Sequence, residues 1–113
     1  MKIAQLMSDL EQFSGTEHYH KHWIGGMYTD GVEFLAQKTN CYWLIDAIFS
    51  YTRAEPFQIW ELEVNHDRTA LLTMKEDDGQ EAKVKQEIKF TDFPEGKMKL
   101  YVSDGVLLLP SEY

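Results

Sequence analysis

The sequence predicts an α+β domain in which N-terminal helices pack on one face of a four- to five-stranded antiparallel meander sheet. In the first half of the chain, apolar residues recur at three- and four-residue steps, whereas from Phe57 onward they alternate with polar residues. Turn signals such as Asp77-Asp78-Gly79 separate the alternating stretches, as in hairpins. The length of 113 residues fits one hydrophobic core, so we expect a single domain over residues 1–113.

Three helices are expected before the sheet. Residues 1–13 carry one apolar stripe at helical spacing. A second helix begins at Thr29 or Asp30, whose side chains can accept hydrogen bonds from free amides, and ends at Asn40, a residue that tolerates the left-handed conformation. The third, over residues 41–51, is apolar on almost every side, so we expect it at the centre of the core.

Five alternating or short apolar stretches are expected to form the strands. They are residues 57–64, 69–76, 82–90, 98–102 and 106–109. In the first of them Trp60, Leu62 and Val64 share one face, which we expect to meet the helices. The Leu71-Leu72 pair leaves open which face of the second strand is buried.

Composition restricts the partners. The formal net charge of -8 opposes attraction to a phosphate backbone, so we expect no direct nucleic-acid partner. No long apolar segment or leader is apparent, and we therefore expect a cytoplasmic protein without membrane contact. The single cysteine, Cys41, excludes an intramolecular disulfide and is expected to be a packed thiol. No cofactor motif occurs, and we expect no cofactor.

His18, His20 and His22 form the one cluster with the character of metal ligands. On a strand the three imidazoles would share a face, whereas on a helix His18 and His22 would be neighbours. Both geometries could contribute ligands, but no HExxH or CxxC motif accompanies the cluster. Solvated or core-edge histidines are the alternative interpretation.

Asp30 and Asp46 are candidate polar residues that could converge with the histidines. Asp46 interrupts an apolar helix, where an ionised carboxylate requires a partner, and Ser50 and Arg53 follow on its side. Its position is compatible with a solvated or salt-bridged seam, a buried polar anchor or a catalytic role.

Phe57, Ile59 and Tyr101 are candidate interaction residues. If they point away from the helices, they form an exposed apolar patch suited to a protein partner. The alternative is that the N-terminal segment covers them.

Five stretches carry a family resemblance: Tyr28-Thr29-Asp30-Gly31, Phe34-Leu35-Ala36, Tyr42-Trp43-Leu44-Ile45-Asp46, Phe90-Thr91-Asp92-Phe93-Pro94 and Leu107-Leu108-Leu109-Pro110-Ser111-Glu112-Tyr113. In these motifs the chain, over nearly its whole length, resembles a family of small uncharacterised bacterial proteins that also occurs in cyanobacteria and on phages and plasmids. That family is classed as a domain of unknown function, and the resemblance implies no activity, cofactor or catalytic residue. The triple histidine and Asn40-Cys41 are not parts of the family pattern.

The function we expect is that of a non-enzymatic protein that binds another protein or forms a homodimer, in a mobile-element context suggested by the resemblance. One alternative is a metal-assisted enzyme that uses the three histidines with Asp30 or Asp46. Another is an acidic inhibitor that mimics nucleic acid, which requires an extended negative surface without interspersed lysines. A third is a small-ligand carrier with a pocket between Trp43, Trp60 and the sheet.

Overall fold

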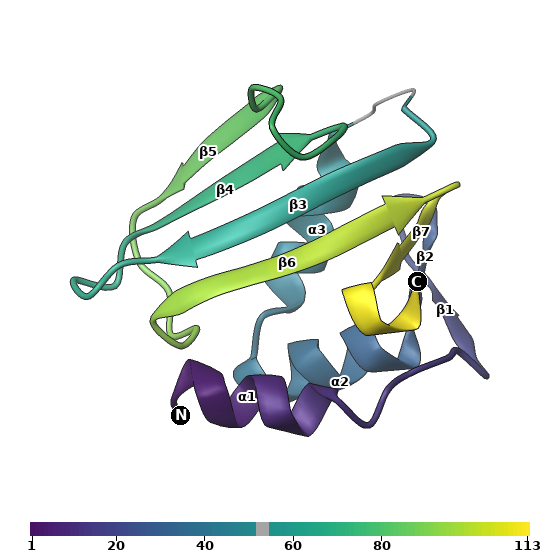
Figure 1. The fold of residues 1–113 in the computed structure, drawn as a ribbon, viewed down its shortest axis with the longest axis horizontal. Coiled ribbons are helices and arrows are strands. Elements are labelled where there is room, and N and C mark those ends of the chain that lie inside the picture. The colour runs from purple at the N-terminus through teal and green to yellow at the C-terminus, as the bar shows by residue number, and fades with distance from the viewer. Residues whose placement is uncertain (52–54) are drawn as a thin grey trace.

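The structure, a computed structural model, describes residues 1–51 and 55–113 and has an α+β architecture, as the sequence predicts (Figure 1). The described helices are α1 (Ile3–Leu10), α2 (Asp30–Thr39), α3 (Tyr42–Ser50) and the 3-10 turn η1 (Pro110–Glu112). The described strands are β1 (Tyr19–Lys21), β2 (Met27–Thr29), β3 (Phe57–Val64), β4 (Ala70–Lys75), β5 (Val84–Ile88), β6 (Gly96–Ser103) and β7 (Val106–Leu108).

The sheet is larger than predicted and mixed, which corrects the four- to five-stranded antiparallel meander. Its order is β1-β2-β7-β6-β3-β4-β5, and β2 runs parallel to β7. Strands β3, β4 and β5 do form a meander, but β6 returns to the other side of β3. The sequence does not predict β1 and β2, because three residues are too few to show an alternating pattern.

The return of β6 depends on the connection between β5 and β6. Phe93 in this connection is 1% exposed and belongs to the core. The Arg68 guanidinium, from the turn between β3 and β4, donates to the carbonyl oxygens of Thr91 (3.2 Å) and Phe93 (2.6 Å). These contacts hold the connection against the end of the sheet, so that β6 begins beside β3.

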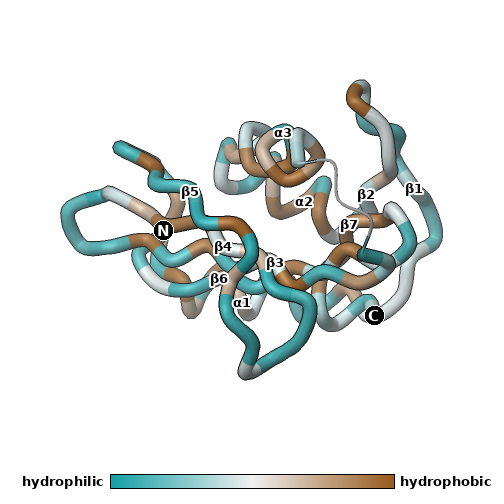
Figure 2. Tube along the Cα trace, turned by 90° about the horizontal axis from the view of Figure 1, so that it is seen from above, coloured by the Kyte–Doolittle hydropathy of each residue, from teal (hydrophilic) through white to brown (hydrophobic). Residues whose placement is uncertain are grey.

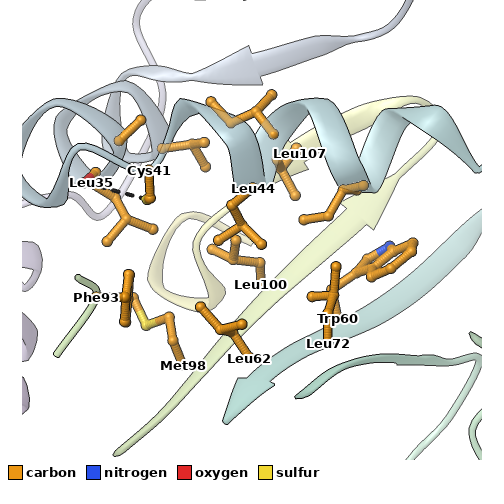
Figure 3. Close-up of a cluster of buried hydrophobic side chains, with 14 of the residues drawn as sticks. Leu35, Cys41, Leu44, Trp60, Leu62, Leu72, Phe93, Met98, Leu100 and Leu107 are labelled. Atoms are coloured by element: carbon orange, nitrogen blue, oxygen red, sulfur yellow. Dashed lines mark hydrogen bonds between the residues drawn. The ribbon is translucent and has the colours of Figure 1, made fainter. Parts of the chain in front are cut away.

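The core lies between one face of the sheet and the helices. Alternate residues of the central strands are buried there, which confirms the expected face of β3 and settles β4 in favour of Leu72. The set is Trp60, Leu62, Val64, Ala70, Leu72, Met74, Met98, Leu100 and Val102. Figure 3 shows Leu44 of α3 and Leu107 of β7 in the same cluster.

Cys41 lies at the start of α3 and is buried. Its thiol is 3.9 Å from the carbonyl oxygen of Leu35 (Figure 3). Burial raises the pKa of this thiol to about 11, which fits a packed thiol rather than a nucleophile.

The ends of α2 follow the predicted signals. The Thr29 hydroxyl oxygen accepts a hydrogen bond from the Val32 amide (3.3 Å), and Asn40 ends the helix at φ 55°. Helix α1 stops at Leu10, earlier than predicted, while Phe13 still packs on the ring of Phe34 at 5.3 Å. None of the helices in the described part of the chain has the length and apolar run that a membrane crossing requires.

Candidate functional site

Strands β1 and β2 form a hairpin that projects beside α3, with a hydrophobic tip (Figure 2). The antiparallel register places His20 opposite Tyr28, and the His22 amide donates to the Gly26 carbonyl oxygen (3.1 Å) to close the loop. Gly26 has φ 79°, and a Cβ there would lie 2.8 Å from Cε1 of Phe49. The glycine therefore allows the loop to lie directly on α3.

The structure brings each predicted carboxylate to one predicted histidine. The His20 Nε2 atom is 2.9 Å from Asp30 Oδ1, and Asp30 Oδ2 accepts the His18 backbone amide at 3.2 Å. The His22 Nε2 atom is 2.6 Å from Asp46 Oδ1. The carboxylate of Asp30 thus fixes the start of β1, and that of Asp46 joins the hairpin to α3.

Of the partners expected for Asp46 along its own helix, Ser50 does not bond to it in the described structure. The Ser50 hydroxyl donates instead to the Ala47 carbonyl oxygen at 2.6 Å. Arg53 lies outside the described residues. Asp46 is therefore placed at a half-exposed seam between α3 and the hairpin, because its side chain is 49% exposed.

His22 is a buried anchor with both ring nitrogens engaged. Its side chain is 4% exposed, and its Nδ1 accepts the backbone amide of Ile24 at 3.2 Å. This bond assigns the ring proton to Nε2, which donates to Asp46. The imidazole ring also lies 5.1 Å from that of Phe49. In this arrangement both ring nitrogens of His22 take part in hydrogen bonds, one to the hairpin loop and one to α3.

The described residues contain no group of three or more His, Cys, Asp or Glu side chains arranged to hold a metal ion. His20 and His22 point to different carboxylates, and His18 contributes its backbone amide to Asp30. The metal site at the three histidines therefore stays a prediction.

Trp23 is the residue of this region that sequence reasoning missed. Its side chain is 80% exposed, yet its indole N–H donates to Asp46 Oδ1 at 3.1 Å. The next residue, Ile24, is 43% exposed. The signal in the sequence was an aromatic and an aliphatic residue directly before a glycine pair, which is typical of a projecting turn.

Two tyrosines extend this surface onto α2 and α3. The Tyr42 hydroxyl donates to Glu33 Oε1 at 2.5 Å, and this bond raises the pKa of Tyr42 to about 12. Burial and the Glu33 carboxylate raise the pKa of Tyr28, with a smaller contribution from Asp46. We name the following residues of the hairpin and of helices α2 and α3 the hairpin–helix face: Trp23, Ile24, Tyr28, Glu33, Tyr42 and Asp46.

The predicted interaction residues lie elsewhere. Ile59 is 4% exposed, whereas Phe57 and Tyr101 are half-buried with ring centroids 5.1 Å apart. Tyr113 covers both rings, at 5.2 and 5.6 Å, so the partial cover comes from the C-terminal segment. A role of these residues in interaction stays a prediction.

The outer face of the sheet carries both signs of charge. Glu61 pairs with Lys99 across β3 and β6, and Lys97 Nζ lies 3.5 Å from Glu63 Oε2. The lysines of β6 thus lie opposite the carboxylates of β3, and this face gives no support to a nucleic-acid mimic.

A ligand pocket between Trp43 and Trp60 also finds no support. Trp60 is 1% exposed, surrounded by core side chains (Figure 3), and its indole N–H donates to Gln58 Oε1 at 2.8 Å. A nearby hollow of about 380 Å³ has Gln58, Phe49 and Gly105 in its wall. The Trp60 ring is thus part of the core and not of a pocket wall.

The C-terminal segment is locked to the start of α2 by one carboxylate. Glu112 accepts hydrogen bonds from the Thr29 hydroxyl (2.6 Å), the Gly31 amide (3.3 Å), the Leu109 amide (3.0 Å) and the Thr16 hydroxyl (3.2 Å). A carboxylate at a helix N-terminus is also favoured by the helix dipole. The Tyr28–Gly31 motif and the C-terminal motif are therefore one structural unit, which fixes the position of Asp30.

Comparison with known proteins gives a family without an assigned activity. Among curated proteins and solved structures, none matches the chain. A family model described as a family of unknown function, DUF6876, matches residues 4–113. The chain therefore belongs to the DUF6876 family.

Proposed function

We propose that this protein is a non-enzymatic binding protein that docks another protein on its hairpin–helix face. The observation that carries the proposal is Trp23, whose side chain is 80% exposed although its indole N–H is fixed to Asp46 at 3.1 Å. Tryptophan is enriched among the residues that dominate interface energies, because it presents a large apolar area with a polar handle.

Hydrogen bonds between His22, Asp46 and Trp23 hold the Trp23 indole in place. Asp46 receives a second hydrogen bond from His22, whose side chain is 4% exposed and therefore fixed by the core. A side chain that is held before binding loses less conformational entropy when a partner covers it. The chain of contacts from core to indole thus favours a prepared binding surface over a solvated loop.

Charge favours a different protein over a second copy of this chain. Each copy carries a formal net charge of -8, so two copies repel one another at low ionic strength. The face itself includes the carboxylates of Glu33 and Asp46. A basic partner is attracted by the same field that opposes self-association.

The proposal is tested by replacing Ile24 with a photo-crosslinking phenylalanine analogue in cells of the source organism. We expect one discrete adduct whose partner is identified by mass spectrometry, and whose purified form binds the natural chain but not Trp23→Ala. The control carries the crosslinker at Phe90, which is 65% exposed near the opposite edge of the sheet. Equal adducts from both positions, or binding unchanged by Trp23→Ala, would contradict the proposal.

A metal-assisted enzyme is the second candidate, favoured by the bond between His20 and Asp30. A carboxylate that holds one imidazole nitrogen leaves the other for a metal or a proton. After chelation, calorimetric titration with Zn²⁺ is expected to give one site that His20→Ala removes. His66→Ala is the control, because the His66 side chain is 94% exposed in another turn. Absence of stoichiometric Zn²⁺ binding by the natural chain would exclude this candidate.

A further inference from the structure

We infer that the partner of the hairpin–helix face presents an arginine side chain, whose guanidinium lies between Glu33 and Asp46 and stacks on Trp23. This inference rests on the proposed function and names the chemistry of its partner. Trp23 and Ile24 expose apolar surface at the hairpin tip. The carboxylate of Asp46 beside them favours a positively charged side chain as the group that covers this surface.

Asp46 retains a free acceptor beside the exposed indole. Its Oδ1 atom already accepts from His22 at 2.6 Å and from Trp23 at 3.1 Å. No donor in the described part of the chain bonds to Oδ2, and the side chain is 49% exposed. A cationic donor that approaches along the indole therefore meets an unused carboxylate oxygen.

Glu33 of α2 provides the second negative group, at the hydroxyl of Tyr42. Tyr42 holds its Oε1 atom at 2.5 Å, and Tyr42 shares one face of α3 with Asp46 because they are four residues apart. The pKa of Tyr28 is raised by burial first, then by Glu33, and to a smaller extent by Asp46. Tyr42 thus links the two carboxylates, because its hydroxyl bonds to Glu33 and its helical position is one turn from Asp46.

Arginine fits this arrangement better than lysine. Its planar guanidinium can donate to two carboxylates at once and can stack on an aromatic face, whereas an ammonium acts as a point charge. The apolar stem of the arginine would cover part of the exposed Trp23 and Ile24 side chains. One arginine side chain can thus cover the exposed apolar surface and pair with the carboxylates of Glu33 and Asp46.

The test uses acetyl-Gly-Arg-Arg-Gly-amide as the probe and the same peptide with citrulline as its neutral isostere. Binding is followed by ¹H–¹⁵N NMR of the Trp23 indole N–H, assigned with Trp23→Phe. We expect saturable shifts with the arginine peptide, a weaker response to the lysine analogue, and none with citrulline. Glu33→Gln is expected to weaken binding about three- to tenfold, which corresponds to the loss of one partly exposed ion pair.

The variants separate recognition from folding. Glu33→Gln retains an oxygen acceptor for Tyr42, and the hydrogen bond of the Trp23 indole goes to Asp46 and not to Glu33, so the Trp23 indole resonance should stay at its place in the free variant. Glu87→Gln, on the opposite edge strand β5, is the matched control and should bind as the natural chain does. Equal shifts with arginine and citrulline, or affinity unchanged by Glu33→Gln, would overturn the inference.

The two proposals can fail separately. If the crosslinker at position 24 captures a partner whose binding does not depend on Glu33, the binding function stands and the arginine inference is wrong. If no partner depends on Trp23, the proposed function fails, and the arginine inference fails with it.

Discussion

At the scale of single residues, Gly31 decides whether the start of α2 and the C-terminal segment can meet. A Cβ at this position would lie 2.5 Å from Glu112 Oε1 and 2.6 Å from Leu109 Cδ1. We expect Gly31→Ala to lower the free energy of unfolding by about 1–3 kcal/mol, the usual range for overpacking. Urea unfolding measures this loss. Gly15→Ala is the control, because nothing lies within 4 Å of a Cβ there; an equal loss in both variants would rule out the contact as the cause.

The hydrogen bond between Tyr42 and Glu33 gives a pH-dependent prediction. Because the pKa of Tyr42 is raised to about 12 in the folded state, from 10.0, the unfolded chain releases this proton first as pH rises. The stabilisation is thus complete below pH 10 and is lost as pH rises toward 12. We expect Glu33→Gln to lower the pKa of Tyr42, measured from the ¹³Cζ shift, whereas Glu87→Gln should leave it unchanged. If the pKa of Tyr42 is the same in Glu33→Gln as in the natural chain, the hydrogen bond to Glu33 is not the cause of the raised pKa.

The sequence predicts that histidines and aspartates belong to the candidate site, but not which histidine pairs with which carboxylate. Asp46 required a partner because it interrupts an apolar helix, and the histidines were visible as a cluster. The pairing of His22 with Asp46 depends on how a hairpin folds onto α3, and no local pattern encodes that contact. Trp23 was missed because the glycine pair after it predicts a turn, but a turn signal does not show whether a neighbouring aromatic side chain is exposed.

At the scale of elements, the end of α2 could be predicted from a local signal, the residue Asn40. Asn40 has φ 55°, a region that costs most residues about 1–2 kcal/mol. We expect Asn40→Ala to lower the free energy of unfolding by about 1 kcal/mol, while Asn40→Gly stays within about 0.5 kcal/mol of the natural chain. Chemical denaturation of both variants measures the difference. Equal stabilities of the alanine and glycine variants would show that this backbone conformation does not limit stability.

The sheet was predictable where its pattern is local. The apolar residues of β3 and β6 alternate with polar ones, and their helix-facing residues follow from that alternation, whereas only the structure decides between Leu71 and Leu72 in β4. The parallel contact of Met27 and Tyr28 with β7 joins segments about eighty residues apart. The position of β6 depends on Arg68 and Phe93, which meet only in the folded chain. The existence of β3 to β7 could therefore be predicted, whereas β1, β2 and the order of the strands could not.

For the whole molecule, charge sets the expected state in solution. The chain has 19 acidic and 11 basic residues, and the sheet's ion pairs neutralise charge only locally. At low ionic strength the remaining charge opposes contact between copies. We therefore expect light scattering of the purified, untagged protein to give the monomer mass of 13.2 kDa.

The same measurement separates the two kinds of partner. Trp23→Ala should elute and scatter as the natural chain does, since in a monomer the exposed indole contacts no second copy. A dimer that Trp23→Ala dissociates would mean that the hairpin–helix face binds a second copy, in spite of the charge. A dimer that persists in this variant would place the self-contact elsewhere, and the apolar rings of Phe57, Tyr101 and Tyr113 would then be the surface to mutate.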